Sequence, residues 1–76
     1  MMMVSLNSKA DTKFHYGERV KFHKDFYGIC KGEIRSVSQS SQCGQNTNQY
    51  VVLTDDCGGH TIYEDFTVCE SDLVKL

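Results

Sequence analysis

The sequence contains no proline and no tryptophan, and no apolar run approaches the roughly 20 residues that span a bilayer. No stretch keeps a helical period for about three turns, so we expect no long helix. With 39% hydrophobic and 24% charged residues, the composition excludes a disordered, collagenous or coiled-coil protein. A chain of 76 residues has room for a single domain with one modest core.

Closely spaced cysteine pairs, which are usual in disulfide scaffolds and zinc ribbons, are also missing. Cys30, Cys43, Cys57 and Cys69 follow one another at spacings of 13, 14 and 12 positions. The first six residues turn polar too soon for a secretory signal. We therefore predict that all the cysteines are free thiols, two or three of them in the core, and that the protein is cytoplasmic.

The charge is small in total but uneven along the chain. The net charge is −2, and seven of the eight Lys and Arg residues lie in residues 1–38, where only four acids occur. Residues 39–76 hold one lysine against six acids, so the two halves carry +3 and −5. A polarised surface follows only if the fold keeps these halves on different faces.

Alternating apolar and polar residues predict strands from Gly17 onward, after a polar and aperiodic segment at 1–13 that we interpret as a flexible arm. The expected strands are 18–23, 32–37, 49–54, 60–68 with a break near its middle, and 73–76. The spacing of Ile34 and Val37 breaks the two-residue period and predicts a bulge. Residues 14–76 are thus expected to form an all-β, five-stranded SH3-like barrel.

The connections are predicted from turn residues. Residues 38–48 form a long polar loop, which we expect to be the most mobile internal segment, and 55–59 a glycine hairpin. Residues 70–73 suggest one helical or 3₁₀ turn capped by Ser71. The predicted core consists of Val20, Phe22, Ile29, Ile34, Val37, Tyr50, Val52, Ile62, Val68, Leu73 and Leu76.

Residues 17–37, which read GERVKFHKDFYGICKGEIRSV, resemble the KOW motif of SH3-like barrels. The motif has a glycine, an acid, a valine, a loop that ends in an aromatic residue and a glycine, and a glycine before an apolar strand. Its glycines let the chain reverse and let one strand cross closely over another. The tail 68–76 is similar to the closing turn and strand of such barrels. The resemblance implies a fold, and nucleic-acid binding as one function.

A second resemblance is to the plasmid-borne type II dihydrofolate reductases, which are also short SH3-like chains. Their Val-Gln-Ile-Tyr stretch, which lines the pore of a tetramer, corresponds here to residues 60–63. Ile62 and Tyr63 match, but Thr61 stands where the family has its pore glutamine. The pore lysine would fall near Phe22 or His23, so the cation that steers anionic substrates is missing. We therefore expect a non-enzyme, with this activity as a further alternative.

Chemistry at cysteine and histidine is weakly indicated. Cys57 and His60 form a Cys-x-x-His pair, but a tetrahedral zinc site needs four such ligands and no second pair occurs. A thiolate, a base and an orienting group could be drawn from four cysteines and three histidines, but no spacing selects them. The predictions are therefore no metal, no cofactor and no catalytic residue, with zinc at Cys57 and His60 as an open alternative.

Binding is the function that the composition favours. We predict a protein-binding module, an adaptor, regulator or inhibitor of the kind that phages and other mobile elements encode. Large amphipathic rings suit binding hot spots, and the candidates are Tyr16, Phe26, Tyr27 and Tyr63. Self-association through an edge strand is a second form of the same function. The alternative is nucleic-acid binding without a membrane role, with phosphate contacts from Arg19, Lys21, Lys24, Lys31 and Arg35.

Overall fold

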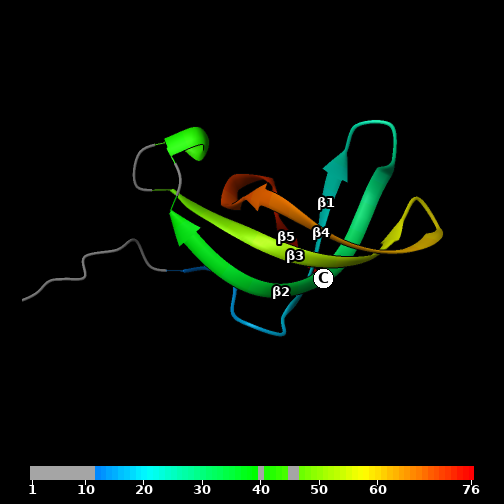
Figure 1. Cartoon of the computed structure of the whole chain (residues 1–76), viewed down its shortest axis with the longest axis horizontal. Coiled ribbons are helices and arrows are strands. Elements are labelled where there is room, and N and C mark those ends of the chain that lie inside the picture. Colours follow the sequence, from blue (N-terminus) through cyan, green and yellow to red (C-terminus); the bar gives the residue numbers. More distant parts are fainter. Residues whose placement is uncertain (1–11, 40, 45–46) are drawn as a thin grey trace, which may run out of the picture.

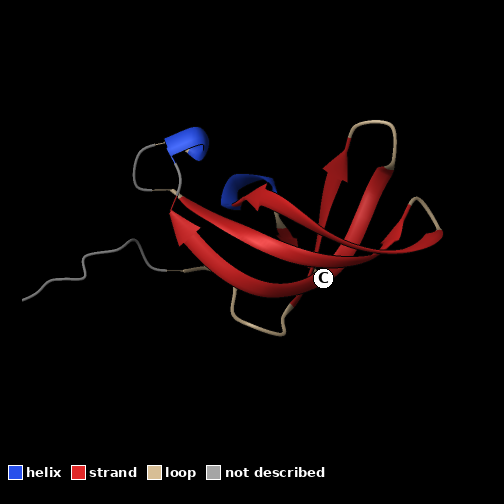
Figure 2. Ribbon diagram, in the orientation of Figure 1, coloured by secondary structure: helices blue, strands red, loops and turns tan. Residues whose placement is uncertain are grey.

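A computed structural model describes residues 12–39, 41–44 and 47–76, which form one antiparallel sheet in the order β4-β3-β2-β1-β5 (Figure 1). The strands are β1 (Arg19–Lys24), β2 (Gly28–Gln39), β3 (Asn48–Cys57), β4 (His60–Cys69) and β5 (Val74–Lys75). Two 3₁₀ turns, η2 (Ser41–Cys43) and η3 (Glu70–Asp72), are the helical elements of the described residues (Figure 2). The all-β prediction is confirmed, but the sheet does not close into a barrel. Residues 1–11 of the predicted arm lie outside the described residues.

The adjacent strands β2 and β3 curve together (Figure 1). Their register shifts between Lys31 and Gly32 and again between Ile34 and Ser36, which confirms the bulge predicted near Ile34. Gly32 faces Thr54 across the pair, and a Cβ atom at Gly32 would lie 2.4 Å from the Leu53 carbonyl oxygen. Glycine is therefore required at this close approach of the two backbones.

The core lies on one face of the curved sheet. It contains seven of the predicted residues, namely Val20, Phe22, Ile34, Tyr50, Val52, Val68 and Leu73. Ile62 is partly buried against them. The prediction is wrong for Ile29, Val37 and Leu76, which are 47%, 44% and 57% exposed. Ile29 is exposed because its neighbour Cys30 faces inward, and alternate residues of a strand face opposite sides.

Three more residues belong to the core: two cysteines, as the sequence analysis expected, and Phe14, which it did not predict. Cys30 and Cys57 are almost fully buried, and Phe14, next to the predicted arm, is 6% exposed. The Phe14 and Tyr50 rings pack edge to face, with centroids 5.5 Å apart. Phe14 therefore fills a core position that lies before the first strand.

The cysteines are not free thiols, which corrects the prediction. Cys30 is bonded to Cys57 and Cys43 to Cys69, so the described residues contain no free cysteine. Cys30 and Cys57 are direct cross-strand partners in β2 and β3. The two disulfides overlap along the chain, since Cys43 lies inside the first loop and Cys57 inside the second.

The connections differ from the prediction in their bounds. β2 continues to Gln39 and β3 begins at Asn48, so the long polar loop is shorter than predicted, and Cys43 within it is held by a disulfide. The mobility predicted for this loop stays a prediction. The β3–β4 turn is confined to Gly58 and Gly59. A 3₁₀ turn is confirmed at Glu70–Asp72, but Ser71 does not cap it, because the N-cap position is Cys69 and no side chain caps the turn.

The buried hydroxyl of Tyr50 joins the start of the described chain to η3. It accepts hydrogen bonds from the backbone N–H groups of Lys13 and Phe14, at 3.2 and 3.4 Å, and donates one to the Glu70 carboxylate. Burial raises the pKa of Glu70, but hydrogen bonds from Tyr50, Asn48 and the Lys13 amide outweigh it, so the pKa lies below its ordinary 4.5. The network ties three distant segments together.

We expect Tyr50→Phe to lower the free energy of unfolding by about 1–2 kcal/mol at pH 7, because it leaves the buried Phe14 amide without its acceptor and removes the hydrogen bond to Glu70. A lowered carboxylate pKa contributes stability above the unfolded pKa that is lost as pH falls through the folded value. The difference between wild type and variant should therefore shrink between about pH 5 and pH 3. Urea unfolding at several pH values measures this, with Tyr63→Phe, an exposed hydroxyl, as control. An undiminished difference at pH 3 would contradict the role given to Glu70.

Candidate functional site

The turn between β1 and β2 presents a phenylalanine to solvent. The Tyr27 amide donates to the Lys24 carbonyl oxygen at 3.1 Å, which closes a four-residue turn with Phe26 in its third position. Phe26 has a φ of 73° and is the only described residue other than glycine with a positive φ. Its ring is fully exposed, at 106% of the reference area. A bulky residue in this conformation is an outlier that normally signals a local constraint or a function.

Next to this turn, rings from three elements meet around Phe66 of β4. The Phe22 and Phe66 rings pack edge to face, with centroids 6.1 Å apart, and the Tyr27 ring lies tilted at 6.2 Å. The Lys24 ammonium lies over the Phe66 ring, 4.9 Å from its centroid. A cation over an aromatic face is held by the quadrupole of the ring. We call Lys24, Phe26, Tyr27 and Phe66 the aromatic turn site.

The base of the aromatic turn site is fixed by the neighbouring β3–β4 turn, which lies at the same end of the sheet (Figure 1). The Gly58 amide donates to the Ile29 carbonyl oxygen at 2.8 Å. A Cβ atom at Gly58 would lie 2.6 Å from the Tyr27 carbonyl oxygen, so only glycine allows this approach. The disulfide between Cys30 and Cys57 joins the two strands just behind both turns. The backbone beneath the site is therefore held by contacts from both turns.

The structure does not gather the four predicted partner residues into one site. Phe26 and Tyr27 lie together, whereas Tyr16 precedes β1 and lies at its opposite end, under the Arg35 guanidinium at 5.0 Å. Tyr63 is 77% exposed and, by strand alternation, faces the side of β4 opposite to Phe66. Only half of the predicted set therefore belongs to the aromatic turn site.

The predicted phosphate-binding cations are mostly engaged within the protein. Arg19 forms two hydrogen bonds with the Asp55 carboxylate, at 2.6 and 3.1 Å, which raise the pKa of Arg19 and lower that of Asp55. Arg35 pairs with Glu33 at 3.3 Å. Together with Lys24 on its ring, three of the five predicted cations have partners in the described structure.

The other two predicted cations, Lys21 and Lys31, face each other directly across β1 and β2. Like charges in this position repel each other. Asp56 is the cross-strand partner of Lys31 on its other side and offsets part of that repulsion. A small cationic spot remains on the outer face of the sheet.

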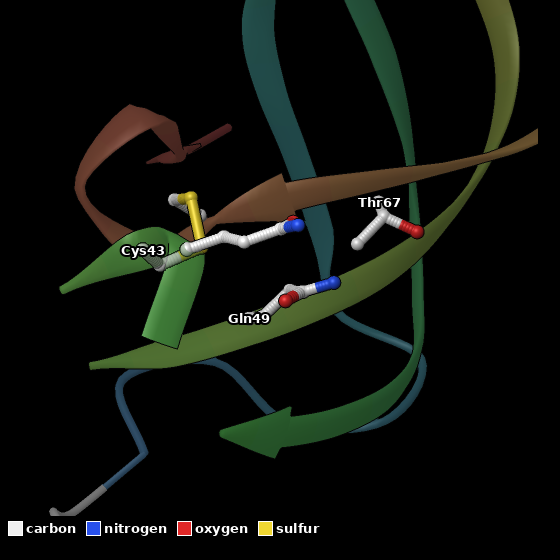
Figure 3. A pocket seen from close by; sticks show the side chains of 5 residues that line it. Cys43, Gln49 and Thr67 are labelled. Atoms are coloured by element: carbon white, nitrogen blue, oxygen red, sulfur yellow. A yellow bond between two sulfur atoms is a disulfide. The ribbon is translucent and has the colours of Figure 1, made fainter. Parts of the chain in front are cut away.

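A shallow hollow lies beside the second disulfide (Figure 3). Its volume is about 440 Å³, and its lining consists of Gln42, Cys43, Gln49, Thr67 and Cys69. These side chains offer amide and hydroxyl groups but no charge. The residues of this lining include no acid or base that could activate the Thr67 hydroxyl as a nucleophile.

All four cysteines are bonded in disulfides, so none is a free thiol that could act as a nucleophile or bind a metal ion. The sulfur of Cys57 is bonded to Cys30 and is not a thiolate that could join His60 in a zinc site, which corrects that alternative. Within residues 12–39, 41–44 and 47–76, no group of three or more His, Cys, Asp or Glu residues could hold a metal ion. None of the described helical elements has the length and apolar character needed to cross a membrane. The resemblance to the dihydrofolate reductases stays a prediction.

Phe66 is the residue of the site that the sequence interpretation missed. It was assigned to a strand but not to the core or to a binding site, because Glu64 and Asp65 interrupt the apolar pattern before it. Pairing Phe66 with Val52 across β3 and β4 would have placed it on the inner face. Comparison with known proteins does not help, since no family model, curated protein or solved structure matches the chain.

Proposed function

We propose that this protein is a non-catalytic protein-binding module whose contact surface is the aromatic turn site. The observation that carries the proposal is Phe26, a fully exposed ring held at positive φ. A type II turn prefers glycine at this position, so phenylalanine costs stability in the unbound protein without burying its ring. Binding to an apolar pocket of a partner would bury that ring, with Tyr27 beside it.

The architecture is consistent with such a module. The strand order supports an SH3-like relationship as part of the proposal, although the sheet is open. Small β domains commonly bind proteins through the loops at one end of the sheet, because the strands hold those loops rigid. Here a disulfide and a hydrogen bond from the β3–β4 turn to β2 supply that rigidity.

The disulfides also bear on where the module acts. Disulfides persist in oxidising environments and are rare in the cytosol, where thiols are kept reduced. The reduced cysteines expected for a cytoplasmic protein are corrected by the two bonded pairs, and the cytoplasmic location itself stays a prediction. We therefore include an oxidising compartment or the cell exterior in the proposal.

The binding proposal is tested by capturing a partner with the oxidised protein and titrating the purified partner against variants. Phe26→Ala should weaken binding by about 2 kcal/mol, roughly 30-fold, as a hot-spot loss. Tyr16→Ala removes an exposed ring at the opposite end of β1 and should leave the affinity unchanged. Equal effects of the two variants would show that the aromatic turn site is not the contact surface.

A stability measurement on the unbound protein tests the strain at Phe26. Phe26→Gly should raise the free energy of unfolding by about 0.5–1 kcal/mol, since relief of a left-handed conformation outweighs the added freedom of the unfolded chain. Phe26→Ala keeps the unfavourable φ and should bring no such gain. Thermal and urea unfolding of both variants distinguishes these outcomes. A loss of stability in Phe26→Gly would mean that the ring contributes to the fold.

Nucleic-acid binding is the second candidate, and the facing pair Lys21 and Lys31 is the observation that favours it. A phosphate between the two ammonium groups would relieve their repulsion. Binding of this kind falls with salt by nearly one unit of logarithmic slope per phosphate contact. Titration with random single- and double-stranded oligonucleotides at two salt concentrations tests it, and absence of binding at low salt would reject it.

A further inference from the structure

The outer edge of β4 is the second feature of the fold that lacks a partner. β4 ends the sheet order and pairs only with β3, and the described residues place no other strand beside it. It is ten residues long, whereas β5 at the other end of the sheet has two. Alternate N–H and C=O groups of an edge strand point away from the sheet and can bind another strand.

The usual protections of an edge strand are few in β4. His60–Cys69 contains no proline, lysine or arginine. Its register with β3 shifts near Thr54, but from Glu64 to Cys69 the pairing is regular. The charged side chains of this edge are Glu64 and Asp65, at the middle of the strand. The edge is therefore open for pairing, and acidic at its centre.

The position of the two acids argues against a second copy of this chain as the occupant. The midpoint of His60–Cys69 lies between Glu64 and Asp65. In the antiparallel self-pairing that uses the whole strand, each acid would face an acid of the other copy. Directly opposed like charges destabilise a strand pair. The acids thus disfavour self-association while attracting a cationic strand.

The two faces of β4 further define the occupant. Phe66 and Val68 pair with the buried Val52 and Tyr50, so Glu64 belongs to the same inner line and Asp65 to the outer line. In a strand added beside β4, two consecutive residues would lie opposite Glu64 and Asp65. The next residue of the added strand on the inner face would lie against Phe66. The Phe66 ring also contacts Tyr27 of the aromatic turn site.

From this geometry we propose that the β4 edge binds an extended segment of a protein partner that carries two adjacent Lys or Arg residues, by adding it as a sixth strand to the sheet. The proposal rests on the proposed function and names the partner's chemistry. Backbone hydrogen bonds supply the pairing, and the two carboxylates select the cations.

The test uses the full-length oxidised protein and a labelled ten-residue peptide of alternating Thr and Val with two central lysines. Fluorescence anisotropy should show at least about tenfold tighter binding than for the peptide with two central glutamates. Methylation of backbone nitrogens along one edge of the lysine peptide should abolish binding, because it removes the donors. Amide exchange should slow at alternate residues of 64–69, the regular part of the edge.

Charge-reversal variants supply the control. Asp65→Lys should lose most of the preference for lysine, whereas Asp72→Lys, which makes the same charge change in η3, should keep it. No binding of the lysine peptide, equal binding of both peptides, or equal effects of the two variants would overturn the proposal. So would a wild-type dimer with protected β4 amides. If capture of the partner still depends on Phe26, the proposed function survives that failure; if only peptide binding is seen, the edge proposal stands and the aromatic turn site does not.

Discussion

Gly32→Ala is expected to cost about 3 kcal/mol or more, a large part of the stability of a domain of this size. The added Cβ would lie 2.4 Å from the Leu53 carbonyl oxygen, 2.8 Å from Thr54 Cα and 2.8 Å from Val52 Cγ1. Two of these are backbone atoms of β3, which cannot turn aside as a flexible side chain can. The β2–β3 pair would have to separate at its bulge.

A second glycine provides the control for this prediction. Gly59 has a φ of 90°, but its Cβ would meet no atom within 4 Å. Gly59→Ala should therefore cost only about 1 kcal/mol, the penalty of the left-handed conformation. Urea unfolding of both variants measures the difference. Similar costs for the two would show that β2 and β3 are not as close at Gly32 as described.

Removal of the disulfides is the other change with a large expected effect. Each disulfide closes a loop of 26 or 27 residues. Because such a loop restricts the unfolded chain, each bond should contribute about 3–4 kcal/mol to the free energy of unfolding. A 76-residue chain has a total stability of roughly 5–10 kcal/mol, so loss of both bonds should leave it largely unfolded. The double variant Cys43→Ala, Cys69→Ala lacks one of the two bonds, so it should lose about 3–4 kcal/mol and remain folded.

The measurement is thermal unfolding with and without a phosphine reductant, together with thiol titration. Native protein should show no reactive thiol, and reduced protein all four. The Cys43 and Cys69 variant should retain a reductant-sensitive transition because Cys30 and Cys57 remain bonded. Four reactive thiols in protein purified without reductant would contradict both bonds.

The features that could be predicted from the sequence are those that depend on residues close together in the chain. Alternation located the strands, the odd spacing of Ile34 and Val37 revealed the bulge, and the paired glycines located the β3–β4 turn. Asp55 and Asp56 were assigned to that turn on their turn propensity, but β3 extends through them to Cys57. Pairing with β2 overrode the local preference there.

The features that the sequence did not reveal depend on contacts between distant residues. The disulfide partners are 27 and 26 positions apart, so a search for close cysteine pairs could not find them. Phe14 is buried because Tyr50 lies beside it, and nothing in residues 1–13 indicates that contact. For the candidate site, Phe26 and Tyr27 were named from the sequence, but the strained φ and the contact with Phe66 are properties of the fold.

The overlap of the two disulfides has a consequence for a nicked chain. Every peptide bond between Cys30 and Cys69 lies inside at least one of the two covalent rings, and those between Cys43 and Cys57 lie inside both. A protease that cuts once anywhere in this span therefore leaves two fragments joined by sulfur. Such a product would migrate as one molecule on a non-reducing gel and as two after reduction. A domain cut once in the connection between β2 and β3 would thus keep all five strands in one covalent unit.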